Sequence, residues 1–148
     1  MKPLAQTMRL DHARCDLLFS KAEAAAEDAR WPDCHAQTRQ FVDALLQHFA
    51  LEEDVLFPAF ERRTGMTGGP TQVMRSEHDQ MRQLVAALNE AVSSQDADAF
   101  ADAAETLLIL MQQHNMKEEN ILYPMVEDSV GAEPEVQAGV ESLAKEAA

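Results

Sequence analysis

Two segments of this chain place a histidine and a glutamate four positions apart on the apolar face of an expected helix. The pair is His48 and Glu52 in HFALEEDVLFP, and His114 and Glu118 in HNMKEENILYP. On a wheel of about 100° per residue, each glutamate shares the apolar stripe of its histidine. A carboxylate in a buried stripe costs several kcal/mol unless a partner compensates it. Imidazole and carboxylate are both metal donors, so a cation is one such partner.

The two segments belong to an internal repeat. A shift of 66 positions superposes three pairs of candidate ligands: His12 on His78, His48 on His114, and Glu52 on Glu118. In each half, the first histidine precedes the second by 36 positions. The repeat therefore predicts two helical hairpins related by a quasi-two-fold axis. Each hairpin supplies one His and one His-x-x-x-Glu.

The combined set of six side chains indicates a metal centre, although its members taken singly do not. A lone histidine in a helix is more often a hydrogen-bonded core residue, and one i,i+4 pair is ordinary. Packing gives no reason for six polar side chains to converge at one depth. Four imidazoles and two carboxylates exceed the four ligands of one zinc ion, but they match two bridged transition ions inside a helix bundle. Such donors suit iron, with manganese or zinc as substitutes.

Loop residues divide the chain into four long helices. RWPDC, TGMTGGP, SSQD and VGAEP interrupt the helical pattern and leave helices over 3–29, 34–63, 70–93 and 97–128. We expect Asp33 to cap the second helix, Pro70 to begin the third, and Ser94 or Asp96 to cap the fourth. Short loops between long amphipathic helices predict an all-α fold, an antiparallel up-down-up-down four-helix bundle. The expected domains are a bundle over 1–130 and a short helical or flexible tail over 131–148.

Composition limits the partners and the compartment. With 148 residues, 46% of them hydrophobic, the chain is long enough for one domain with its own core. The formal net charge of −14 argues against nucleic acid or an anionic membrane as a partner. No N-terminal apolar segment or membrane span is present in the pattern, so we expect a cytoplasmic protein. Cys15 and Cys34 do not suggest a disulfide scaffold, and Cys15 fits a buried core position.

At these motifs the chain resembles the hemerythrin-like family, the His-His-Glu cation-binding domains of bacteria. The resemblance extends over about residues 8–127 and rests on the paired HxxxEExxLFP-like segments. It implies a hemerythrin-like four-helix bundle with a non-haem di-iron centre. Members of the family bind or sense oxygen or nitric oxide, or take part in iron handling and iron-centre repair.

The resemblance also implies a role for each candidate ligand. His12 and His48 would bind one iron, His78 and His114 the other, and Glu52 and Glu118 would bridge the two, together with an oxo or hydroxo group. The respiratory oxygen carriers add a further histidine in the third helix, where this chain has Arg82. With this donor set each octahedral iron keeps one open position, whereas the carriers have an open position on one iron only. Two open positions favour redox reaction, nitric oxide binding or iron loss over stable oxygen storage.

Asp16 and Arg82 are candidate neighbours of the centre. Each lies four positions after the first histidine of its half, so we expect them to form an ion pair that borders the cavity. The alternative is that Asp16 is an extra iron ligand. Glu53 and Glu119 lie on the outward side of the wheel and are interpreted as solvated.

The leading functional prediction is a metal-binding protein that binds or senses a small diatomic molecule, oxygen or nitric oxide. The alternative is a redox enzyme, or an iron-handling or repair protein, that uses the same six ligands. We assign no catalytic residue because no additional base or substrate-cleft signal is present. Phe57 and Tyr123 fall about 180° from the ligand face. We interpret them as packing under the tail or at a helix bend, and a homodimer contact is the alternative. No protein partner can be identified.

Overall fold

The computed structural model describes residues 2–147, which form helices and connecting turns without a strand. The all-α prediction is therefore confirmed. The elements are α1 (Leu4–Glu27), α2 (Trp31–Leu51), the π-helical turn η1 (Glu52–Leu56), α3 (Phe57–Thr64), α4 (Pro70–Ser93), α5 (Ala97–Lys117), the π-helical turn η2 (Glu118–Leu122), α6 (Tyr123–Val130) and α7 (Pro134–Ala147).

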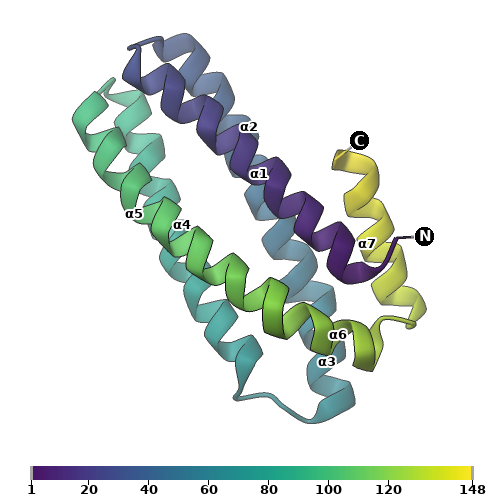
Figure 1. Ribbon diagram of the computed structural model, residues 1–148. Helices are drawn as coiled ribbons and strands as arrows, with labels where there is room; N and C mark the ends of the chain where they lie inside the picture. The colour runs from purple at the N-terminus through teal and green to yellow at the C-terminus, as the bar shows by residue number, and fades with distance from the viewer. Residues whose placement is uncertain (1, 148) are drawn as a thin grey trace.

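The long helices pack along their lengths as two hairpins. Helix α1 lies against α2 and α4 lies against α5, while α1 also contacts α5 and α2 contacts α4. Figure 1 shows the α1–α2 turn and the α4–α5 turn at the same end of this bundle. These four helix–helix contacts place the four long helices around one common interior.

Helix ends agree with most of the expected signals. Asp96 caps α5, because its carboxylate accepts a hydrogen bond from the Ala99 amide. Pro70 is the first residue of α4, as expected. The expectation for Asp33 is wrong, since α2 begins at Trp31 and places Asp33 in its first turn. A carboxylate there still interacts favourably with the helix dipole.

Two π-helical turns interrupt the helices that we expected to run unbroken over 34–63 and 97–128. Pro58 and Pro124 lack the amide hydrogen that would bond to the carbonyl four residues earlier. The preceding amides donate instead over five residues, from Phe57 to the Glu52 carbonyl and from Tyr123 to the Glu118 carbonyl. Each π turn inserts extra residues into one turn and rotates every later side chain about the helix axis.

Two hydrophobic clusters fill the interior and leave a polar layer between them. One includes Phe19, Phe41, Leu88 and Leu107, and it also buries Cys15 as expected. The other includes Met8, Phe57, Tyr123 and Val126 at the end of the bundle where the chain termini lie (Figure 1). The four histidines of the repeat are buried between these clusters.

Helix α7 covers the second cluster. Val136, Val140 and Leu143 of α7 are buried there. A Cβ added at Gly139 would lie 2.6 Å from a methyl group of Leu51, so α7 packs closely on α2. The C-terminal segment is thus helical over Pro134–Ala147, while its separation from the bundle as a distinct domain stays a prediction.

No helix within residues 2–147 combines the length and the apolar character needed to cross a membrane.

Candidate metal centre

The six candidate ligands converge in the polar layer. One donor atom from each of four residues lies within 4.8 Å of the others in a first group: Glu52, His78, His114 and Glu118. A second group meets the same limit: His12, His48 and Glu118. All six side chains are buried, with exposed fractions of 5% or less. The structure therefore groups the histidines in the two pairs that the repeat predicted.

The two glutamates lie between the histidine pairs. Glu52 has one oxygen 3.5 Å from His48 Nε2 and the other 3.1 Å from His78 Nε2. Glu118 Oε1 lies 3.1 Å from His12 Nε2 and 3.2 Å from His114 Nε2. Each carboxylate thus contacts one imidazole of either pair. A bridging ligand requires this placement between two ions.

Buried donor atoms without a partner fit the expected cations. Four donor atoms of the candidate ligands are buried and have no hydrogen-bond partner among the described residues: Glu52 Oε1, His78 Nε2, His114 Nε2 and Glu118 Oε2. His78 Nε2 and Glu52 Oε1 are within ion-pair distance, but they are not aligned for a hydrogen bond. Buried polar atoms are nearly always satisfied, so this cluster calls for a ligand. Nitrogen and oxygen donors in this ratio suit a transition metal.

Every histidine of the centre holds a carboxylate on its second ring nitrogen. The Nδ1 atoms of His12, His48 and His78 lie 2.7 Å from carboxylate oxygens, and that of His114 lies 2.8 Å from one. The partners are, in the same order, Glu119, Asp11, Glu53 and Glu77. Donation from Nδ1–H leaves the lone pair on Nε2 facing the interior. Carboxylate–histidine pairs of this kind orient metal-binding imidazoles and increase their basicity.

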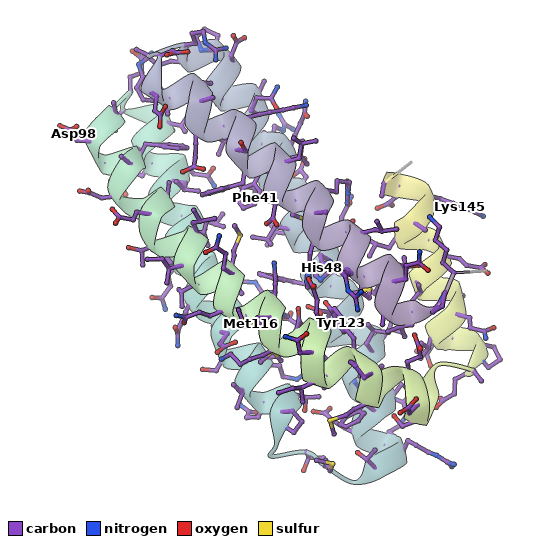
Figure 2. The ribbon with its side chains drawn as sticks, in the orientation of Figure 1. Phe41, His48, Asp98, Met116, Tyr123 and Lys145 are labelled. Atoms are coloured by element: carbon purple, nitrogen blue, oxygen red, sulfur yellow. The ribbon has the colours of Figure 1, made fainter. Side chains whose placement is uncertain are left out.

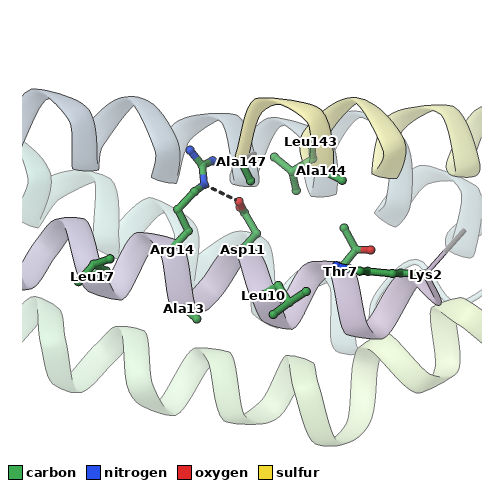
Figure 3. Close-up of a pocket in the computed structure, with 10 residues that line it drawn as sticks. All are labelled: Lys2, Thr7, Leu10, Asp11, Ala13, Arg14, Leu17, Leu143, Ala144 and Ala147. Atoms are coloured by element: carbon green, nitrogen blue, oxygen red, sulfur yellow. Dashed lines mark hydrogen bonds and ion pairs between the residues drawn. The ribbon is translucent and has the colours of Figure 1, made fainter.

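Each of these outer carboxylates also meets a cationic side chain. Asp11 accepts from Arg14 at 2.9 Å beside a pocket between α1 and α7 (Figure 3). Glu77 pairs with Lys117, and Glu119 lies 3.6 Å from Arg9. The negative charge that faces each histidine is thus balanced on its outer side. The interpretation of Glu53 and Glu119 as solvated residues is therefore wrong.

Arg82 binds Glu53 instead of Asp16, so the predicted Asp16–Arg82 ion pair is wrong. The guanidinium donates to both Glu53 oxygens, at 2.7 and 3.0 Å, and to Asp79 at 3.2 Å. It also lies over the Phe49 ring, 5.3 Å from its centroid. Asp16 is exposed on α1, which packs chiefly against α2 and also contacts α5 and α7. Glu53 follows α2 and contacts His78 and Arg82 of α4. Arg82 thus supports His78 through Glu53, and the role of Asp16 as an extra ligand stays a prediction.

The electrostatics of the layer favour ionised carboxylates. Burial opposes ionisation of Glu52, but the charge of His48 and hydrogen bonds from neighbouring side chains outweigh it and hold the pKa of Glu52 well below its usual 4.5. Burial likewise opposes protonation of His114, yet the Glu118 carboxylate raises the pKa of His114 to about 9. Hydrogen bonds from His48 and the charge of Arg14 lower the pKa of Asp11 despite its burial. The carboxylates of the layer are thus held in the ionised form in which they bind cations.

Tyr123 reaches into the centre beside the first histidine pair, contrary to the expectation that it points away. Figure 2 shows its side chain next to His48 in the interior of the bundle. Its hydroxyl lies 3.0 Å from His48 Nε2, 3.1 Å from His12 Nε2, 2.7 Å from Glu52 Oε2 and 2.9 Å from Glu118 Oε1. Because of the π turn η2, Tyr123, five residues after Glu118, lies on the same face of the helix as Glu118. Phe57, its counterpart in the repeat, is buried with its ring centroid 5.9 Å from that of His78.

The residues that sequence reasoning missed carry a signal in the same repeat. Asp11 and Glu77 are 66 positions apart, and so are Glu53 and Glu119. The shift therefore superposes the outer carboxylates as well as the ligands. The sequence signal for Tyr123 was indirect. Pro124 follows Tyr123 as Pro58 follows Phe57, and both prolines accompany π turns.

Substitution of Glu53 tests the role of the outer carboxylates. Glu53→Gln is expected to lower the affinity of the centre for metal by about 10- to 100-fold, because a neutral amide holds the His78 imidazole less firmly than a carboxylate does. Competition with a chelator of known affinity measures this change. Asp54→Asn is the matched control, since Asp54 is the exposed neighbour of Glu53 in η1. Equal affinities in the two variants would show that Glu53 does not support the centre.

Comparison with known proteins agrees with this geometry. The family model described as the hemerythrin HHE cation binding domain matches residues 4–126. A protein named DNA nickase from Nostoc sp. (strain PCC 7120 / SAG 25.82 / UTEX 2576) is 24% identical to this chain over 138 residues. The match covers 93% of this chain but 37% of the relative's length. No solved structure matches the chain.

Proposed function

Because this chain belongs to the hemerythrin HHE cation-binding family, we propose that it is a non-haem di-iron protein that binds or senses oxygen or nitric oxide. His12 and His48 hold one iron, His78 and His114 hold the other, and Glu52 and Glu118 bridge them. Iron in such a centre supplies one-electron redox chemistry and an affinity for diatomic molecules. The other groups of the site are side chains of the protein.

The position of two buried glutamates between the histidine pairs is the observation that carries this proposal. Glu52 Oε2 and Glu118 Oε1 both contact the Tyr123 hydroxyl. Glu52 Oε1 and Glu118 Oε2 are the buried oxygens without a partner among the described residues. Glu52 turns one oxygen toward each histidine pair, whereas Glu118 reaches His12 and His114 through the same oxygen, Oε1. Both carboxylates therefore contact both pairs, which a single-metal site would not require.

The proposed centre draws one histidine from each of four helices, and we infer that these helices follow the up-down-up-down order. The connections over 28–30 and 94–96 are short, and α1 lies against α2 as α4 lies against α5. Short connections between neighbouring long helices favour antiparallel packing. In this proposal, residues 1–130 form the di-iron domain and 131–148 form its C-terminal tail.

The likeness to the Nostoc protein does not lead us to propose nickase activity here. The chain spans 37% of that protein's length, and the nicking chemistry can reside in the remainder. The formal net charge of −14 repels the phosphate backbone of a duplex. The buried donor cluster, in contrast, has a direct use in metal and diatomic binding.

Metal analysis combined with optical spectroscopy tests the proposed function. Iron-reconstituted protein is expected to hold two irons per chain, and the absorption spectrum of the reduced protein should change on addition of oxygen or nitric oxide. Saturation at one iron per chain would contradict the di-iron assignment. Two irons with a spectrum that neither gas alters would contradict the gas-binding role.

A further inference from the structure

The quasi-two-fold symmetry of the centre is broken at a pair of positions that differ by one hydroxyl group. Ligands and outer carboxylates are matched across the 66-residue repeat, but Phe57 in the first half corresponds to Tyr123 in the second. Both side chains are fully buried. The Tyr123 hydroxyl is therefore one difference between the surroundings of the two histidine pairs.

Among the four histidines, the hydroxyl contacts the first pair alone. Tyr123 lies within 3.1 Å of donor atoms from both histidines of the first pair and from both glutamates. Around the second pair, Phe57 presents a hydrocarbon ring, and the Phe49 ring stacks on His78 at 3.9 Å. All four unpartnered donor atoms of the centre belong to Glu52, Glu118 and this second pair. The first pair is thus supplied with an additional oxygen and the second is not.

The distances around the Tyr123 oxygen are those between ligands of one ion. Neighbouring donors on an octahedral ion are about 3.0 Å apart when the metal–ligand bonds are about 2.1 Å. The four printed separations of the hydroxyl range from 2.7 to 3.1 Å. Each ligand of an octahedron has four such neighbours, and Tyr123 has four in the two imidazoles and two carboxylates. Tyrosine is an established oxygen ligand of iron in proteins.

We propose that Tyr123 is a ligand of the metal held by His12 and His48, and that its presence directs external ligands to the metal held by His78 and His114. This inference rests on the proposed di-iron function and specifies which of the two ions meets the diatomic molecule. Tyr123 occupies a position at the first ion as a phenolate, with its proton released to solvent when the metal enters. The second ion has no equivalent oxygen and keeps that position open.

Spectroscopy of the iron-loaded, air-oxidised chain tests the assignment. A ferric phenolate absorbs visible light by charge transfer, and Tyr123 is the single tyrosine among the 148 residues, so any such band belongs to it. We expect the band in the wild-type protein and its loss in Tyr123→Phe, with two irons retained in both. Two irons without the band in the wild type, or a band that persists in Tyr123→Phe, would overturn the assignment. A wild type that takes up no iron would overturn the proposed function itself.

Azide as a probe of open positions provides the second measurement. Wild-type protein should bind one azide per chain, and Tyr123→Phe should bind two because it opens the first ion. Phe57→Tyr is the matched control at the symmetry-related position, and it should add a second phenolate signal and abolish azide binding. Two azides bound by the wild type, or a Phe57→Tyr variant identical to the wild type in spectrum and azide binding, would overturn the proposed inequality of the two ions.

Discussion

Replacement of Glu52 by alanine is expected to cost the protein both metal ions, whereas replacement of His12 is expected to weaken one of them. Glu52 lies between imidazoles of both pairs, at 3.5 Å from His48 and 3.1 Å from His78. A bridging carboxylate contributes a bond and a negative charge to each ion, while an imidazole serves the ion that it faces. Loss of the bridge also leaves the two cations repelling each other in a buried site.

Metal content measured after reconstitution and gel filtration distinguishes these variants. We expect Glu52→Ala and Glu118→Ala to retain well below one ion per chain and His12→Ala to retain about one. His35→Ala is the control, since His35 is exposed on α2 and outside the repeat, and it should retain two. If His12→Ala and Glu52→Ala lose the same amount of metal, the glutamate is not a bridge.

Removal of the metal is expected to lower the thermal stability of the protein. The centre keeps four histidines and two glutamates in the interior, and four of their donor atoms have no hydrogen-bond partner among residues 2–147. Binding of an ion to the folded state alone adds RT ln(1 + [L]/Kd), about 2.7 kcal/mol at a hundredfold excess over Kd. For a domain of this size each kcal/mol shifts Tm by roughly 2–4 °C. One ion is therefore worth about 5–11 °C, and two ions more.

Calorimetric melting of loaded and chelated samples at one pH measures this effect. Glu52→Ala serves as the internal control, because a variant without a functional centre should melt at the same temperature with and without the chelator. Identical melting temperatures for the loaded and chelated wild type would mean that metal does not bind in the bundle core. A chelator effect equally large in Glu52→Ala would mean that the stabilising metal binds elsewhere.

The 66-residue repeat made the candidate centre predictable from the sequence. Helical periodicity is local, so the spacing of His48 and Glu52 shows that both share the face that a helix buries. The repeat then indicates that two such faces meet across a quasi-two-fold axis. The structure brings the six residues together, with His12 next to His48 and His78 next to His114. Their role as ligands stays a prediction. The family resemblance is confirmed by the model that matches residues 4–126.

The outer carboxylates needed the folded chain, although their spacing was already visible. Whether Glu53 faces water or a histidine depends on the neighbouring helix that packs beside it, which a single-helix wheel does not include. The same holds for Arg82, whose partner was predicted from symmetry alone. Its guanidinium binds Glu53 because α2, which leads into η1, packs against α4, whereas Asp16 is exposed on α1. Contacts between helices are set by packing, and they cannot be read from the periodicity within one helix.

Tyr123 shows most clearly what the tertiary structure decided. A wheel with about 100° per residue places it opposite the ligands, and that estimate holds as long as the helix remains α-helical. Pro124 marks a break, but proline can kink, end or bulge a helix. In this chain it follows a π turn, in which the Tyr123 amide bonds to the Glu118 carbonyl five residues earlier. The wider turn rotates all later residues about the helix axis and places the Tyr123 hydroxyl in the centre. Angular position adds up along a helix, so one altered turn redirects every side chain after it.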